Sequence, residues 1–179
     1  MQGTPEVAIL RLGHRPGRDE RTTTHVGLTA RALGADRVVL ANAAASRRET
    51  IEDITDRFGG PFDVDVTERP MHRIREWDGT VVHLTMYGLP VQDVEDEIRD
   101  SFEGGSDLLV VVGAEKVPFE VYERADYNVA VTNQPHSEIA SLAVLLDRLF
   151  DGDELDREWE DAEHVVVPEP AGKRVEEVE

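Results

Sequence analysis

Short apolar runs alternate with longer segments of mixed polarity along the chain. Most runs are rich in Val, Ile and Leu, as in Leu108 to Val112, which is typical of a buried strand. The run 62–66 (FDVDV) alternates between apolar and acidic residues, so we expect it at an edge or half-exposed position. Strands are expected at 6–12, 37–41, 62–66, 80–86, 108–112, 127–131 and 164–167.

Helix signals occupy most of the segments between these strands. Thr22 to Thr24 offer an N-cap hydroxyl for a helix that ends near Leu33, and Ser46 with Glu49 forms a capping box for a helix that runs to Phe58. This alternation predicts an α/β fold with a mostly parallel sheet and helices on both faces. Further helices are expected at 90–102 and 137–150, and three apolar residues of the segment 68–78 are assigned to the core: Met71, Ile74 and Trp77.

The stretch from Asp107 to Phe150 places polar loops after two neighbouring strands. Gly113 ends the first strand and opens the loop GAEKVP, and the loop TNQPHS follows the second strand. In open α/β sheets, ligands bind beyond the carboxyl ends of the strands. Most such loops bind nothing, but a simple turn does not require the polar side chains found here. We interpret them as a candidate ligand site: Glu115, Lys116, Asn133, Gln134 and His136.

The 179 residues suffice for one α/β domain. No apolar run approaches the roughly 20 residues that span a bilayer, and the N-terminus lacks the pattern of a secretory signal. Cysteine is absent, which excludes disulfides and thiolate chemistry. We therefore expect a cytoplasmic protein without a membrane segment, with a single domain over residues 1–167 and a flexible acidic tail over 168–179.

The formal net charge of −19 is the unusual bulk property of the chain. Only two of the 19 basic residues are lysines, Lys116 and Lys173. An acidic, lysine-poor composition suits a cytoplasm at molar salt, where the Debye length is about 3 Å and self-repulsion is screened. We interpret the acidity as a halophilic adaptation; the alternative is an acidic role in partner binding.

Residues 1–50 run against this trend, with eight arginines and five acidic residues. Arg11, Arg15 and Arg18 lie close together in a segment that Pro16 and Gly17 mark as a turn. Guanidinium groups suit phosphate geometry, so these three arginines are candidate RNA contacts. The alternative is a solvated surface loop. The charge asymmetry itself indicates an anionic partner at this end of the chain.

Several common chemistries have no motif in this sequence. There is no Gly-x-Gly-x-x-Gly after a strand, no phosphate-binding Gly-x-x-x-x-Gly-Lys-Ser/Thr loop and no Gly-x-Ser-x-Gly nucleophile elbow. His14, His25 and His136 lack the spacing of metal ligands, so no metal site is expected. His83 lies within an expected strand, where a core histidine is the simpler interpretation.

Four segments resemble one protein family: RLGHRPGRDERTTTHVGLTARALGADRVVL, HLTMYG, VVGAEKVP and NQPHSEIASLAVLLDRLF. Together they are similar to the archaeal tRNA cytidine-56 2′-O-methyltransferases, which belong to the SPOUT class of S-adenosylmethionine-dependent RNA methyltransferases. The likeness covers the chain from about Val7 to the tail. It implies a C-terminal deep trefoil knot, a homodimer, tRNA as substrate and S-adenosylmethionine as methyl donor.

The resemblance also implies that backbone groups of three loops hold the donor. Glu115 matches the glutamate of the second motif of the class, whereas Glu138 stands where relatives often carry asparagine. Ser137 has the alternative role of a helix cap. The residues implied in donor binding are Leu84, Gly113, Ala114, Glu115, Lys116, Val117, Val131, Thr132, Asn133, Gln134, Pro135, His136, Ser137 and Glu138.

For catalysis, a ribose 2′-hydroxyl must attack the sulfonium methyl in line and lose its proton. In ribose-methylating relatives an arginine on the first helix is implicated, and its position here falls on Leu28 or Arg31, depending on the alignment. Arg21, about two turns before Leu28, shares that helix face if the helix begins early. We predict Arg21 as the catalytic residue. The alternatives are a SPOUT enzyme that methylates a base nitrogen and a non-catalytic RNA- or nucleotide-binding knotted dimer.

Overall fold

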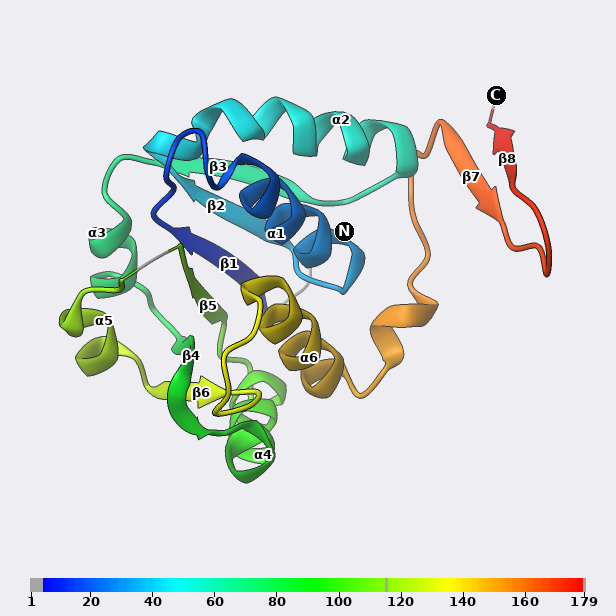
Figure 1. Cartoon of the computed structure of the whole chain (residues 1–179). Coiled ribbons are helices and arrows are strands. Elements are labelled where there is room, and N and C mark those ends of the chain that lie inside the picture. The colour runs from blue at the N-terminus through cyan, green and yellow to red at the C-terminus, as the bar shows by residue number, and fades with distance from the viewer. Residues whose placement is uncertain (1–4, 115, 179) are drawn as a thin grey trace.

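The computed structural model describes residues 5–114 and 116–178 and centres on a six-stranded sheet (Figure 1). The strand order is β3-β2-β1-β5-β4-β6, and every neighbouring pair is parallel. The expected parallel α/β sheet is confirmed. Its strands are β1 (Val7–Leu12), β2 (Arg37–Ala41), β3 (Asp63–Thr67), β4 (Thr80–Pro90), β5 (Leu108–Gly113) and β6 (Tyr127–Ala130).

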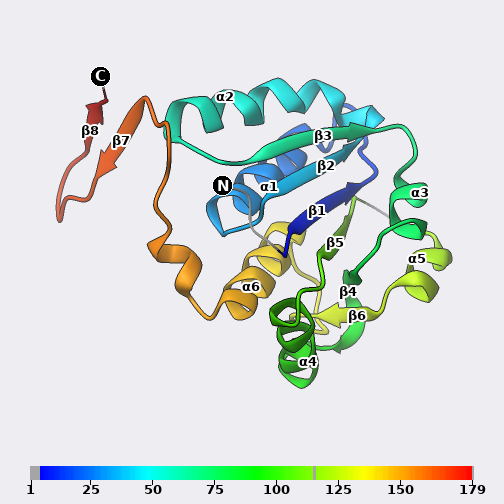
Figure 2. The same ribbon diagram turned by 180° about the vertical axis from the view of Figure 1, so that it is seen from behind.

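Helices cover both faces of the sheet, as Figures 1 and 2 show from opposite sides. One face packs against α1, α2, α4 and α6, and the other packs against the short helices α3 and α5. No helix in the described ranges is long and apolar enough to cross a membrane. The helices are α1 (Glu20–Ala32), α2 (Arg48–Phe58), α3 (Pro70–Arg75), α4 (Val91–Glu103), α5 (Phe119–Arg124) and α6 (Glu138–Phe150), with 3-10 helices η1 (Asn42–Arg47) and η2 (Asp153–Asp156).

The central strand β1 is buried on both sides because its residues alternate between two cores. Val7 and Ile9 belong to one apolar cluster, and Ala8 and Leu10 belong to the other. Burial on both faces explains the uninterrupted apolar run in the sequence. The edge strand β3 instead turns its two aspartates toward Arg37, which confirms the expected half-exposed edge.

The helix ends agree with the sequence signals at one site and differ at two. Ser137 caps α6, because its Oγ accepts a hydrogen bond from the amide of Ile139 at 3.2 Å. Thr22 to Thr24 are not the N-cap of α1, because the helix starts earlier, after Asp19. Ser46 lies within η1 and forms no capping box, since the residue before α2 makes no side-chain cap hydrogen bond. The local polar patterns therefore indicated where these helices lie, but not at which residue each helix begins.

The C-terminal segment forms a hairpin of β7 (His164–Val167) and β8 (Arg174–Glu177). This hairpin stands apart from the main sheet in Figures 1 and 2. Before it, Trp159 lies under the guanidinium of Arg31, with 4.2 Å between Cζ and the ring centroid. Residues 174–177, within the tail expected over 168–179, pair with β7 through part of their backbone groups.

The acidic segment 151–163 contains one buried carboxylate, that of Glu154. Its carboxylate oxygens have no hydrogen-bond partner in the described chain, and burial, with repulsion from Asp147, raises the pKa of Glu154. With a raised folded pKa, stability falls as the pH rises above the unfolded pKa of about 4.3. Glu154→Gln is therefore expected to raise the free energy of unfolding by about 1 kcal/mol at pH 7 in a denaturant titration.

The gain from Glu154→Gln should disappear below about pH 4, where the wild-type carboxyl is protonated in both states. Asp156→Asn provides the matched control, since it removes the same charge from an exposed residue of the same 3-10 helix. An equal gain from Asp156→Asn would assign the effect to net charge and not to burial.

Candidate functional site

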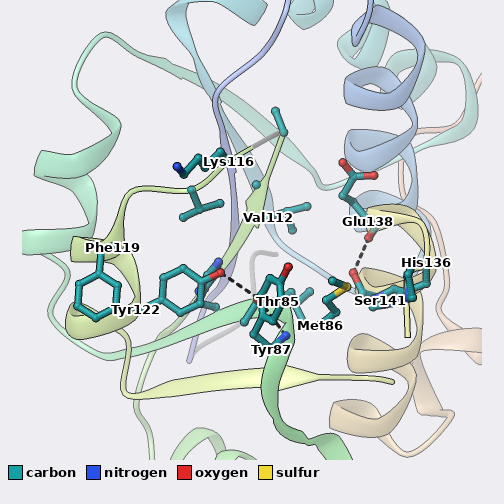
Figure 3. A pocket seen from close by; sticks show the side chains of 16 residues that line it. Thr85, Met86, Tyr87, Val112, Lys116, Phe119, Tyr122, His136, Glu138 and Ser141 are labelled. Atoms are coloured by element: carbon teal, nitrogen blue, oxygen red, sulfur yellow. Dashed lines mark hydrogen bonds between the residues drawn. The ribbon is translucent and has the colours of Figure 1, made fainter. Parts of the chain in front are cut away.

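A pocket of about 780 Å³ opens beside the carboxyl ends of β4 and β5. Small-molecule sites commonly measure roughly 300–1,000 Å³. In Figure 3 the aromatic side chains of α5 stand on one side of the pocket and the start of α6 on the other. The lining residues are His83, Leu84, Thr85, Met86, Tyr87, Val112, Gly113, Ala114, Lys116, Val117, Phe119, Tyr122, Pro135, His136, Glu138 and Ser141.

Strand β4 supplies the middle of this pocket because it bulges away from β6. The pairing with β6 jumps from Leu84 to Leu89, and the residues between them leave the ladder. Gly88 lies so close to the backbone of Asn128 that an added Cβ would collide with it. Only glycine permits this approach. The bulge places Thr85 at the pocket, where Figure 3 shows it facing α5.

His83 is fully buried and forms part of the pocket wall. Asn128 donates from Nδ2 to the carbonyl of Tyr122 at 2.9 Å, which leaves its Oδ1 to accept from His83 Nδ1 at 2.9 Å. Burial lowers the pKa of His83, so its ring is neutral at neutral pH. The Tyr122 ring packs edge-on against it, and the Tyr122 hydroxyl lies 3.2 Å from Thr85 Oγ1. The expected core position of His83 is confirmed, and its ring is held by a hydrogen bond and a ring contact on this side of the pocket.

Eight of the residues predicted to hold the donor line the pocket: Leu84, Gly113, Ala114, Lys116, Val117, Pro135, His136 and Glu138. Five others do not line it: Val131, Thr132, Asn133, Gln134 and Ser137. Asn133 instead joins two loops, because its Nδ2 donates to the carbonyls of Met86 and Gly88 at 2.8 and 3.0 Å. Glu115 lies outside the described residues.

The other eight lining residues were missed by sequence reasoning: His83, Thr85, Met86, Tyr87, Val112, Phe119, Tyr122 and Ser141. A signal for the first four was present, because HLTMYG spans the carboxyl end of the strand expected at 80–86. The bulge that turns this segment into a pocket wall depends on long-range pairing with β6, which local patterns do not contain.

Arg11 is a correction to the predicted RNA contacts, because its side chain is fully buried. Its Nη1 donates to the carbonyl of Gly113 at 2.6 Å and lies 3.9 Å from Glu138 Oε1. Its Nε donates to Thr23 Oγ1 at 3.3 Å, and the same hydroxyl lies 2.8 Å from His14 Nδ1. Arg11 thus joins β1 and α1 to two walls of the pocket and does not face solvent.

Arg15 and Arg18 differ in their surroundings, although they are neighbours in one loop. The backbone amide, Nε and Nη2 of Arg15 donate hydrogen bonds of 2.8 to 3.0 Å to the carboxylate of Asp19. These bonds lower the pKa of Asp19 to about 2. Arg18 is exposed and makes no ion pair with any described residue. The Arg15 side chain therefore shapes the loop, and the Arg18 side chain is available to a partner.

Arg21 lies exposed in the first turn of α1, and its side chain has no hydrogen bond or ion pair to the described chain. Arg31 lies ten residues later, about 15 Å along the helix. Its Nη2 donates to the carbonyl of Gly59 at 2.5 Å, and burial lowers the pKa of Arg31. Leu28 is half-buried between them and carries no polar group. Of the three candidate positions, only Arg21 presents a free guanidinium.

The arrangement combines a mostly apolar pocket with cations at the neighbouring loop. Its polar groups, including Lys116, His136 and Glu138, lie at separate points of the wall. Within the described ranges, no group of three or more His, Asp or Glu side chains is placed to hold a metal ion. Such a pocket suits an organic molecule with an apolar ring system and a charged end, next to an anionic partner.

Comparison with known families agrees with this chemistry. Residues 58–176 match the family described as tRNA ribose 2′-O-methyltransferase, aTrm56. The chain belongs to the tRNA ribose 2′-O-methyltransferase family. Curated relatives named tRNA (cytidine(56)-2′-O)-methyltransferase include one from Haloarcula marismortui, which is 70% identical over 98% of this chain and 97% of its own length. One from Thermococcus kodakarensis is 53% identical over 97% of this chain and 98% of its own length.

Solved structures of lower identity confirm the fold of this tRNA ribose 2′-O-methyltransferase family member. The A. aeolicus TrmH/SpoU tRNA modifying enzyme superposes with a TM-score of 0.60 at 14% identity, covering 87% of this chain and 78% of its own. The SpoU methyltransferase AviRb from Streptomyces viridochromogenes, solved with AdoMet, gives a TM-score of 0.54 at 17% identity, covering 84% and 59%. The SPOUT-type fold expected from the sequence is therefore correct.

Proposed function

We propose that this family member transfers the methyl group of S-adenosylmethionine to the ribose 2′-oxygen of cytidine 56 in tRNA. The pocket at the carboxyl ends of β4 and β5 carries the proposal, because it gathers eight residues predicted to hold the donor. The position within tRNA is supported by the names of relatives that are 50–70% identical over nearly the whole chain.

The lining of the pocket fits this donor. Leu84, Val112 and Tyr122 give apolar surfaces suited to the adenine ring, while Lys116 and Glu138 offer opposite charges for the amino-acid end. These loops belong to the stretch for which the resemblance implies a deep trefoil knot. A knotted backbone would hold the loops in fixed positions, and a preformed pocket loses little entropy on binding.

In the proposed reaction, the 2′-oxygen forms a bond to the methyl carbon while the bond from that carbon to sulfur breaks. The sulfur leaves with the electron pair as a neutral thioether, and the hydroxyl proton passes to an acceptor. We assign the alignment of this hydroxyl to Arg21, the exposed arginine in the first turn of α1, whose guanidinium donates a hydrogen bond to the 2′-oxygen while the proton passes to solvent water. Arg18, also exposed, is assigned to a neighbouring phosphate.

We also propose that the enzyme acts as a homodimer. Three large apolar side chains beside the pocket are exposed in the single chain: Tyr87 by 76%, Leu89 by 62% and Phe119 by 73%. Exposed groups of this size close together are typical of a protein interface. Dimerisation through this surface would cover the pocket mouth and exclude water from the methyl donor.

The test is methyl transfer to an unmodified tRNA transcript at high potassium chloride concentration, with methyl-labelled donor. We expect one label per tRNA, on the ribose of cytidine 56, located by nuclease digestion. A transcript with cytidine 56 changed to uridine provides the control for position. Label on a base would favour a base methyltransferase, and donor binding without transfer would favour a non-catalytic binding protein; either result would overturn the proposal.

A further inference from the structure

Acidic residues outnumber basic ones by 38 to 19, so an exposed arginine without an acidic partner is notable in this protein. Most exposed arginines of the described chain are paired with a carboxylate. The pairs are Arg48 with Glu52, Arg57 with Asp53, Arg75 with Glu120, Arg124 with Glu120, Arg148 with Glu95 and Arg174 with Glu169. A surface that keeps unpaired cations in such a chain is a candidate for binding an anion.

Helix α3 and the residue before it form such a surface. Arg69, His72 and Arg73 are exposed, and none of them forms an ion pair with a described residue. The other side of the helix is apolar: Ile74 and Met71 pack in the apolar cluster between the sheet and the helices α3 and α5. The three cationic or titratable side chains are therefore not needed for packing, and they face away from the core.

The position of α3 is fixed relative to the donor pocket. Arg75 donates from Nε and Nη2 to the two carboxylate oxygens of Glu120 on α5, at 2.6 and 2.8 Å. The same helix α5 supplies Phe119 and Tyr122 to the pocket wall. In Figures 1 and 2, α3 and α5 lie together on the side of the sheet toward which β1 points, where α1 also begins. Cations on α3 thus have a set position beside the site of methyl transfer.

We propose that Arg69 and Arg73, with His72 between them, form a phosphate-binding surface that holds the tRNA backbone beside the donor pocket. The proposal rests on tRNA being the substrate. Arg69 directly precedes α3, and its carbonyl accepts a hydrogen bond from the Arg73 amide at 3.2 Å, which holds the two residues together. Two neighbouring guanidinium groups suit consecutive phosphates, and phosphate contacts position a nucleic acid without reading its sequence. Arginine suits this task better than lysine, because its planar fork makes two directed hydrogen bonds to one phosphate.

The experiment compares the wild-type enzyme with a double variant, Arg69→Ser with Arg73→Ser. We expect the KM for the tRNA transcript to rise at least about tenfold, with kcat and the Kd for S-adenosylmethionine within about twofold. The slope of log Kd for tRNA against log salt should fall by about 1 to 2, because two phosphate contacts are lost. Arg69→Lys with Arg73→Lys should lie between the two enzymes, since it retains the charge without the fork.

The matched control is Arg57→Ser with Arg174→Ser, which removes two positive charges from α2 and the C-terminal hairpin. This control should leave the KM for tRNA near that of the wild type. An equal rise in both double variants would show an effect of net charge and overturn the proposal. An unchanged KM and salt slope in the Arg69→Ser, Arg73→Ser variant would also overturn the proposal. Tighter binding of an acidic peptide than of tRNA at this surface would overturn it as well. A wild-type enzyme that binds tRNA but transfers no methyl would contradict the proposed function alone, because filter binding still tests the surface.

Discussion

Arg21→Ala is expected to lower kcat for methyl transfer at least about 100-fold while leaving the Kd for S-adenosylmethionine within about twofold. Removing one positioned hydrogen-bond donor to the reacting oxygen typically costs about 10²–10³-fold in kcat, and Arg21 is the exposed arginine of α1 that has no partner in the described chain. The donor pocket lacks any lining residue from α1, so donor binding should not change. Single-turnover transfer and calorimetric titration with the donor measure the two quantities separately.

Arg18→Ala is the matched control for Arg21→Ala, since it removes the same charge three residues away. It should raise the KM for tRNA and leave kcat near the wild-type value, because a phosphate contact contributes to binding and not to the chemical step. Equal losses of kcat in both variants would assign the effect to the charge of the loop. A normal kcat for Arg21→Ala would remove Arg21 from the catalytic role.

Much of the fold was predictable because the pattern of apolar residues in each strand indicates which of its faces are buried. The run Leu108 to Val112 has apolar residues at every position, as a central parallel strand requires, and FDVDV alternates as an edge strand should. Features that depend on contacts between distant segments were not predictable. Strand β7 was expected at 164–167, but its pairing with the exposed strand β8 was not, and Trp159 packs under a helix more than a hundred residues earlier.

The sequence predicted the site residues that follow the ends of strands, but it did not predict the direction in which individual side chains point. Gly113 and Lys116 follow a strand end, so their place in the pocket agrees with a rule for open sheets. Arg11 lay in the same basic segment as Arg18, but its position within the strand was the better signal. Alternation from Val7 and Ile9 places residue 11 on the same buried face.

The buried position gives Arg11 a different role, which a second large effect should reveal. Arg11→Met is expected to raise the Kd for S-adenosylmethionine at least about tenfold and to lower the free energy of unfolding by about 2–4 kcal/mol. The substitution removes the 2.6 Å hydrogen bond to the Gly113 carbonyl and the ion pair with Glu138. Both partners line the pocket, so its two walls lose their common anchor.

Arg31→Met separates this positioning effect from general instability. Arg31 is also a buried arginine that donates to a backbone carbonyl, but its partner Gly59 is far from the pocket in the chain and absent from its lining. We expect Arg31→Met to lower the free energy of unfolding without changing the Kd for the donor. Equal weakening of donor binding by both variants would show that lost stability alone explains the effect at Arg11.

The ion pair itself can be isolated with a double-mutant cycle of Arg11→Met and Glu138→Gln. The two residues share one contact at 3.9 Å, so their effects on donor affinity should not add. Additive effects would mean that Arg11 acts through the Gly113 carbonyl alone. At saturating donor, the KM for tRNA should stay within about twofold of the wild type in Arg11→Met, because a fully buried side chain has no access to RNA. A large rise in that KM would restore the RNA contact that the sequence suggested and contradict the positioning role.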